Sequence, residues 1–158
     1  MNALAAASAI AAAGCVIAAA VQDVRRFEIA DGLSIAIVLL FLPFAASQVH
    51  GWEWAYHAAA GAAIFAVGVG LFAMNWMGGG DVKLLGACAL WAGLDGLPTL
   101  MLGTMLAGGV LASVALVGRR LAGNDSGHAY PGLRAGGPIP YAVAILGGVA
   151  TWAATIFS

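Results

Sequence analysis

Long uncharged apolar runs are the feature that most limits what this chain can fold into. Several of them approach the ~20 residues that a helix needs to cross a ~30 Å hydrocarbon core. Because 63% of the 158 residues are hydrophobic and only 8% are charged, a water-soluble fold has too little polar sequence to cover them. A transmembrane β-barrel would show alternating strands of about ten residues, which do not appear here. The sequence therefore predicts an all-α, polytopic membrane protein with a single integral-membrane domain over residues 1–158.

The runs and the polar links between them predict six transmembrane helices. Their approximate spans are 2–22, 33–49, 57–76, 79–94, 97–118 and 139–157. Pro43 favours a kink in the second helix. The fourth is ambiguous, because its uncharged part, Leu84–Leu94, is too short to span alone, and a re-entrant segment is the competing interpretation. A tight turn at Asp95–Pro98 and a polar loop at Arg119–Gly137 are expected on either side of the fifth helix.

Basic residues indicate the orientation of the six helices. All of them fall on one face: Arg25, Arg26, Lys83, Arg119, Arg120 and Arg134. The other face holds only Glu53 and Asp95 as charges, together with the interfacial rings of Trp52, Trp54 and Tyr56. The basic face is therefore predicted to be cytoplasmic, with both termini on the non-cytoplasmic side. No basic residue precedes the first run, which favours a retained helix over a secretory signal.

Two aspartates stand out, because charge beside such apolar sequence is costly and indicates a functional site. Asp23 ends the first run, and Asp81 lies in the segment GGGDVKLL, Gly78 to Leu85. Six helices place both on the cytoplasmic face. Two neighbouring carboxylates cannot both ionise cheaply, so they share a proton and act as acid and base together. In an aspartic-protease arrangement such a pair activates water and polarises a peptide carbonyl, without a metal or a cofactor.

The residues around Asp81 have further predicted uses. Gly78, Gly79 and Gly80 lack side chains, so an extended substrate backbone can approach the carboxylate closely. Lys83, the only lysine, either holds Asp81 ionised or extends back to water. A lone aspartate near a membrane interface is more often a solvated helix end. The combination of GGGDVKLL, a second aspartate on the same face and six helices is what favours a site.

Other charged residues are assigned simpler roles. Glu28 and Asp31 lie near Asp23 in the sequence, but a solvated loop explains them better than a catalytic role. The positive-inside rule accounts for Arg134 without a contact to substrate. No basic tract is present, so a nucleic-acid partner is set aside.

Histidines, cysteines and glycines point to packing and not to a metal site. The three histidines are scattered over different links without ligand spacing. Cys15 and Cys88 lie inside apolar runs without a CxxC pattern, which favours buried packing. Glycines in the runs are expected to let helix backbones approach closely: Gly61, Gly68, Gly70, Gly103 and Gly108.

Three segments resemble the signature regions of the type IV prepilin peptidases, which are polytopic GxGD aspartic proteases of bacterial and archaeal membranes. They are Asp23–Ile29, Gly78–Leu85 and Gly137–Ala142. They occur in matching order over most of the chain, and GGGDVKLL is the most specific. The resemblance implies that Asp23 and Asp81 are the catalytic pair. It also implies a cut on the cytoplasmic side of a prepilin's hydrophobic helix, after a short basic leader that ends in glycine.

The chain departs from the family pattern in two places. Larger members carry a cysteine-rich zinc loop and methylate the new N-terminus; this chain lacks that loop, so N-methyltransferase activity is not expected. It looks more like the small peptidase-only members associated with Flp-type pili. The family often shows Ile-Pro-Asn or Ile-Pro-Asp where this chain has Ile29-Ala30-Asp31. The missing proline concerns the start of the second helix and not the carboxylate.

The predicted function is an aspartic endopeptidase of the bacterial inner membrane that processes prepilin-like precursors at its cytoplasmic face. Its partners are the precursor and the lipid bilayer. The rival interpretation is a small ion- or proton-coupled transporter, or a nonenzymatic membrane scaffold, in which Asp23 and Asp81 bind a cation. The sequence shows no inverted repeat with broken helices near the midplane, which counts against transport. It leaves open which aspartate is the acid and which the base.

Overall fold

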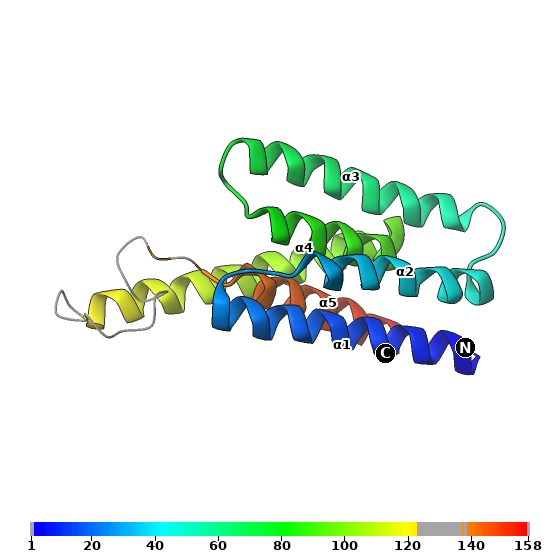
Figure 1. Ribbon diagram of the computed structural model, residues 1–158, viewed down its shortest axis with the longest axis horizontal. Helices are drawn as coiled ribbons and strands as arrows, with labels where there is room; N and C mark the ends of the chain where they lie inside the picture. The colour runs from blue at the N-terminus through cyan, green and yellow to red at the C-terminus, as the bar shows by residue number, and fades with distance from the viewer. Residues whose placement is uncertain (1, 123–136, 138, 158) are drawn as a thin grey trace.

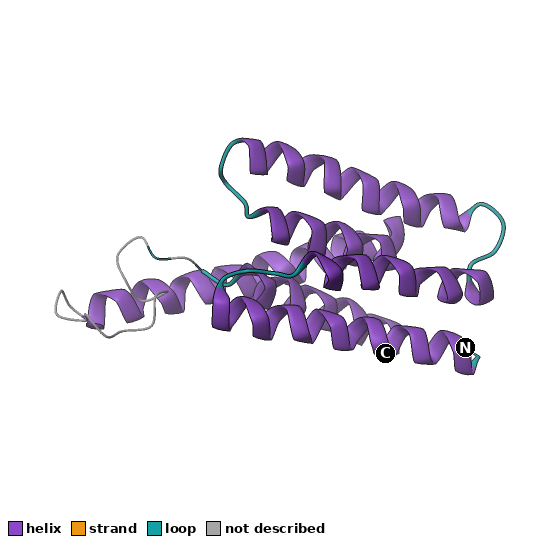
Figure 2. Cartoon of the chain, in the orientation of Figure 1, coloured by secondary structure: helices purple, strands orange, loops and turns teal. Residues whose placement is uncertain are grey.

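A computed structural model describes residues 2–122, 137 and 139–157 of the chain. The described part is helical and contains no strand (Figure 2). Its helices are α1 (Ala3–Arg26), α2 (Asp31–Gln48), α3 (Glu53–Ala73), α4 (Gly79–Ala122) and α5 (Tyr141–Phe157). The all-α prediction is confirmed. Most of the predicted polar loop, including His128 and Arg134, lies outside the described residues, as does Pro138.

The helices form one bundle. The first, α1, packs against α2 and α5, and α4 packs against α2, α3 and α5. Figure 1 shows the end of α1 and the starts of α2 and α4 at one end of the bundle, with the link between α2 and α3 at the other. Among the described residues, α1 to α4 are each long and apolar enough to cross a membrane. The bundle thus has the helices of a membrane protein.

Helices α1 to α3 extend further at some ends than the apolar runs predicted. The first helix continues to Arg26, so Asp23 lies inside it and not after it. The second begins at Asp31, and the third begins at Glu53, which places Trp54 and Tyr56 in its first turns. Hydropathy identifies the part of a helix that lies in the hydrocarbon core of the membrane. Polar and interfacial residues can continue the same backbone hydrogen bonding beyond that part.

The chain reverses direction within α4 at Gly93. This residue has φ 64° and ψ −179°, so the helix is interrupted there. Figure 1 shows the second part of α4 running back in the opposite direction to the first. The predicted turn at Asp95–Pro98 is therefore wrong, because both residues belong to the helix that follows Gly93. A positive φ is readily adopted by glycine, so the reversal occurs at Gly93 and not at the proline.

The first part of α4 ends with partners from two other helices. Residues 79–92 rise about 21 Å, which is less than the ~30 Å hydrocarbon core. A helix end at such depth needs protein partners for its backbone carbonyls. Nδ1 of His57 in α3 lies 2.9 Å from the Leu90 carbonyl oxygen, to which its N–H donates. The Trp91 indole N–H donates to the Ile37 carbonyl of α2 at 2.9 Å. These bonds hold the reversal against α2 and α3.

We expect His57→Leu to lower the stability of the protein by about 1–3 kcal/mol, because it leaves the Leu90 carbonyl without its side-chain donor. The measurement is thermal unfolding of the purified protein in detergent. His50→Leu is the matched control: its side chain is exposed, so a change within about 0.5 kcal/mol is expected. Equal melting temperatures for the two variants would contradict the capping role of His57.

Glycines bring helix backbones together at three of the predicted positions. A Cβ on Gly61 or Gly68 would fall 3.1 Å or 2.8 Å from side-chain atoms of α4, and one on Gly103 would overlap α5. The prediction of close approach is confirmed for these three. It is wrong for Gly70, where an added Cβ would meet no atom of the described residues within 4 Å. An added Cβ on Gly108 would make only an ordinary contact at 3.5 Å.

Candidate active site

Asp23 is held between α1 and α5. It lies in the last turns of α1, and only 6% of it is exposed. Its Oδ2 accepts a hydrogen bond of 2.9 Å from the backbone N–H of Ala142, in the first turn of α5. The first N–H groups of a helix lack partners within it, so a carboxylate that accepts a hydrogen bond from one of them is stabilised. This contact joins two of the segments that carried the resemblance, although they are 119 residues apart in the chain.

Asp81 occupies the first turn of α4. Its Oδ2 lies against Gly78, where an added Cβ would be 2.8 Å from the oxygen. Its Oδ1 is buried, and no described residue donates a hydrogen bond to it. Buried polar atoms are nearly always paired in folded proteins. An unpaired carboxylate oxygen at a helix start is therefore available to a molecule that enters the site.

The two carboxylates open into one cavity of about 310 Å³. It is lined by Asp23 and Asp81, the three glycines before Asp81, and the link after α1 at residues 27–29. Both carboxyl groups line this one small cavity, so their charges interact. Two such groups ionise together only at a cost, so the pair takes up a proton more readily than an isolated aspartate does. Chemically, the arrangement offers an acid and a base that face the same small volume.

The link after α1 is folded over the cavity by two local contacts. Phe27 has φ 53°, a backbone conformation that is unusual for a bulky residue, and its N–H donates to the Asp23 carbonyl at 2.8 Å. The Gln22 side chain then accepts a hydrogen bond of 2.7 Å from the N–H of Ala30. Together they turn the chain so that Glu28 and its neighbours line the cavity. Sequence reasoning missed both contacts, since neither residue type signals them.

The three glycines serve packing within the protein. A Cβ on Gly80 would fall 3.0 Å from the Cβ of Ile29, and one on Gly79 would fall 3.3 Å from the ring of Phe72. Gly78 is in contact with Asp81 itself. Their absent side chains therefore let the link after α1 and the end of α3 close around the start of α4. The approach of a substrate backbone stays a prediction.

Lys83 does not pair with Asp81. Its Nζ lies 2.7 Å from Oδ1 of Asp31, at the start of α2. Both side chains are largely exposed, and they face a second cavity, not the one that holds the aspartates. Of the two acidic residues assigned to a solvated loop, Glu28 lines the cavity of the aspartates and Asp31 does not.

Comparison with known proteins gives one family. The model of the type IV leader peptidase family matches residues 10–113, more than half of the chain, and this range includes Asp23 and Asp81. No curated protein and no solved structure matches the chain.

Proposed function

Because this chain belongs to the type IV leader peptidase family, we propose that it is a membrane aspartic endopeptidase that removes the short basic leader from Flp-like type IV prepilins. The observation that carries the proposal is the shared cavity, into which Asp23 and Asp81 open from helices far apart in the sequence. A cavity of about 310 Å³ admits a short stretch of extended peptide and a water molecule between the two carboxylates.

The proposed reaction uses the two carboxylates and water. The ionised member takes a proton from the water, whose oxygen attacks the peptide carbonyl carbon, while the protonated member donates a hydrogen bond to the carbonyl oxygen. The pair then returns a proton to the leaving amine, and the C–N bond breaks. The hydrogen bond from Ala142 keeps the Asp23 carboxylate aimed into the cavity. No side chain becomes covalently attached to the substrate.

The proposed location is the bacterial inner membrane, with the cavity open to the cytoplasm. Arg25 and Arg26 end α1 at the same end of the bundle as the two aspartates (Figure 1). The second part of α4 runs back past that end of the bundle, with Arg119 and Arg120 in its last turn. The positive-inside rule makes an end with this charge cytoplasmic. In the proposed topology the two parts of α4 are the fourth and fifth membrane helices, of which the fourth ends inside the hydrocarbon core at Gly93. Helix α5 is the sixth, and both termini are non-cytoplasmic.

Glu28 suits a basic leader. It lies in the link after α1, is exposed, and lines the cavity of Asp23 and Asp81. Its carboxylate adds negative charge beside the other two. Opposite charges at the rim of a binding site speed association and set the register of the bound segment. In the proposal the residues before the cut lie on this side of the carboxylates.

The test is cleavage of a purified precursor by the purified protein in lipid nanodiscs. We expect a single cut after a glycine at the end of a basic leader, with a free unmethylated amine on the product, both read by mass spectrometry. Since the proposed mechanism needs no metal, EDTA is expected to leave the rate unchanged within about twofold. A precursor left intact, or cleavage abolished by EDTA and restored by a metal, would overturn the proposal.

A further inference from the structure

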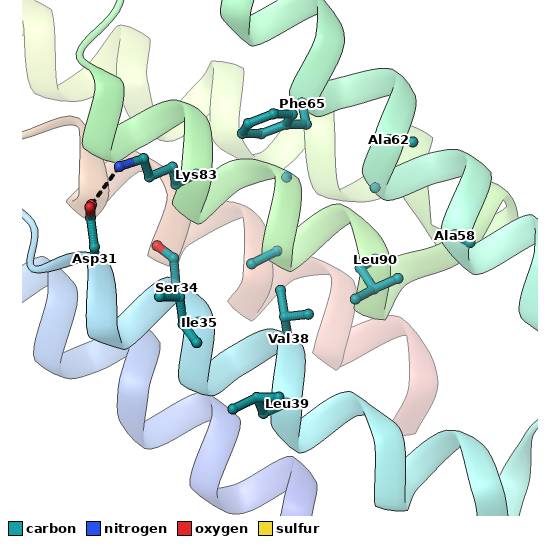
Figure 3. A pocket seen from close by; sticks show the side chains of 13 residues that line it. Asp31, Ser34, Ile35, Val38, Leu39, Ala58, Ala62, Phe65, Lys83 and Leu90 are labelled. Carbon is teal, nitrogen blue, oxygen red and sulfur yellow. Dashed lines mark hydrogen bonds and ion pairs between the residues drawn. The ribbon is translucent and has the colours of Figure 1, made fainter.

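A second, larger cavity lies beside the start of α4. This groove, of about 600 Å³, runs between α2, α3 and the first part of α4 (Figure 3). The ion pair of Asp31 and Lys83 stands at one end of it, and the rest of the lining is almost entirely apolar. Ile35, Leu39 and Phe65 are 57%, 57% and 45% exposed, so the groove is open along the side of the bundle.

The groove adjoins the cavity of the two aspartates. Asp31 directly follows the link after α1 that lines that cavity, and Lys83 lies two residues after Asp81. The first turn of α4 thus borders both spaces. From Lys83 to Leu90 the groove follows α4 for about 10 Å, close to two helical turns. A segment lying in the groove has its polar end beside the carboxylates.

Ser34 marks the polar end of the groove as a place for a ligand. It is 5% exposed, and its hydroxyl oxygen is buried without a hydrogen-bond partner among the described residues. Figure 3 shows it next to the pair of Asp31 and Lys83. A buried hydroxyl without a partner costs about 1–3 kcal/mol, and an occupant that hydrogen-bonds to it recovers that cost.

We propose that this groove seats the apolar helix of the precursor that follows the scissile bond. The inference rests on the proposed function and specifies how its substrate is held. The first N–H groups of a helix have no partner within it, and the hydroxyl of Ser34 and the carboxylate of Asp31 are acceptors placed to receive them. The apolar lining takes the side chains that follow.

The same groups disfavour an anionic lipid as the occupant. Among the described residues that line the groove, Lys83 is the one cation, and it is already paired with Asp31 at 2.7 Å. A phosphate headgroup would meet the carboxylate as well as the ammonium group. A helix start carries a partial positive charge and no formal one, which suits this end of the groove.

The test compares Ala62→Trp with Ala63→Trp in nanodiscs. Ala62 lines the groove; Ala63 is its neighbour on α3, is also exposed, and is not part of the lining. An indole at position 62 fills space that the precursor helix needs, so we expect kcat/KM for precursor cleavage to fall by about tenfold or more. Ala63→Trp is expected to stay within about twofold of the unsubstituted protein. Melting temperatures verify that both variants are folded.

A photo-crosslinking residue at position 62 or 63 gives a second measurement. It is placed in the Asp81→Asn variant, so that the precursor is bound but not cut. We expect a crosslink to the precursor's apolar helix from position 62 and none from position 63. Crosslinks to phospholipid alone, or to the precursor equally from both positions, overturn the groove proposal.

The outcomes separate the two proposals. If the unsubstituted protein cleaves the precursor and the two tryptophan variants cleave it equally well, the groove assignment is wrong and the peptidase assignment stands. If the unsubstituted protein leaves the precursor intact, the proposed function is wrong and the groove assignment falls with it.

Discussion

Asp81→Asn is expected to slow precursor cleavage by roughly 10³-fold or more without unfolding the protein. Asparagine has nearly the same shape as aspartate, so the start of α4 and its contact with Gly78 are kept. It can neither accept a proton from water nor share one with Asp23. The measurement is the single-turnover rate of cleavage in nanodiscs, followed on a gel by the shortening of the precursor.

Asp23→Asn is expected to have an effect of the same size. The asparagine side-chain oxygen can still accept the hydrogen bond from the Ala142 N–H, so α1 and α5 stay joined. Asp95→Asn is the matched control, because Asp95 is exposed next to the reversal at Gly93 and outside the cavity. Cleavage by either catalytic variant at the rate of Asp95→Asn would remove the basis for a carboxylate pair.

Gly148→Ala is expected to destabilise the protein by about 3 kcal/mol, at the upper end of the range for overpacked sites. A Cβ at this position of α5 would lie 2.6 Å from the carbonyl oxygen of Leu100 and 2.9 Å from the amide nitrogen of Thr104. Both are backbone atoms of α4, which cannot move aside as a side chain can. The two helices must separate. The measurement is thermal unfolding in detergent.

Gly109→Ala is the control for this prediction. Gly109 also lies in a helix, the second part of α4, but an added Cβ would meet no atom of the described residues within 4 Å. Alanine favours a helix over glycine by up to about 1 kcal/mol, so this variant is expected to melt at the same or a higher temperature. Because α5 carries the N–H that binds Asp23, Gly148→Ala should also reduce cleavage. Equal melting temperatures for the two variants would show that the close approach of α4 and α5 is not rigid.

The membrane fold and the proximity of the aspartates were accessible from sequence because both depend on properties that sequence expresses directly. Burial in lipid requires apolar runs, and the runs here are long and uncharged. Two intervening crossings return the chain to the side from which it started, so Asp23 and Asp81 were expected at the same end. That expectation depends only on an even number of membrane crossings between the two aspartates, and not on where any one helix begins or ends.

The sequence predicted the turn at Asp95–Pro98 and not at Gly93, because hydropathy contains no information about where the helix is interrupted. Asp95 and Pro98 are the usual signs of a turn, but the chain turns where a single residue adopts a positive φ. The cap from His57 on the Leu90 carbonyl depends on how α3 packs against α4. Such a contact is a consequence of the tertiary structure, so a histidine without ligand spacing gave no sign of it.

The immediate surroundings of the aspartates were also beyond the sequence. The hydrogen bond from Ala142 is made by a backbone N–H, which every residue except proline carries, so no residue type announces it. Lys83 is the charge nearest to Asp81 in the sequence, yet its Nζ pairs with Asp31 at the start of α2, 2.7 Å away. The nearest charge in the sequence was a poor guide to the nearest charge in space.

The most direct test of the account is the cleavage rate of the double variant Asp23→Asn/Asp81→Asn beside the two single variants. Residues that act as one unit lose their whole effect when either is removed. The account predicts that all three variants cleave the precursor at the same residual rate, within about threefold. It would be contradicted if the double variant lost cleavage rate by the product of the two single losses. A single variant that keeps most of the original rate would also contradict it.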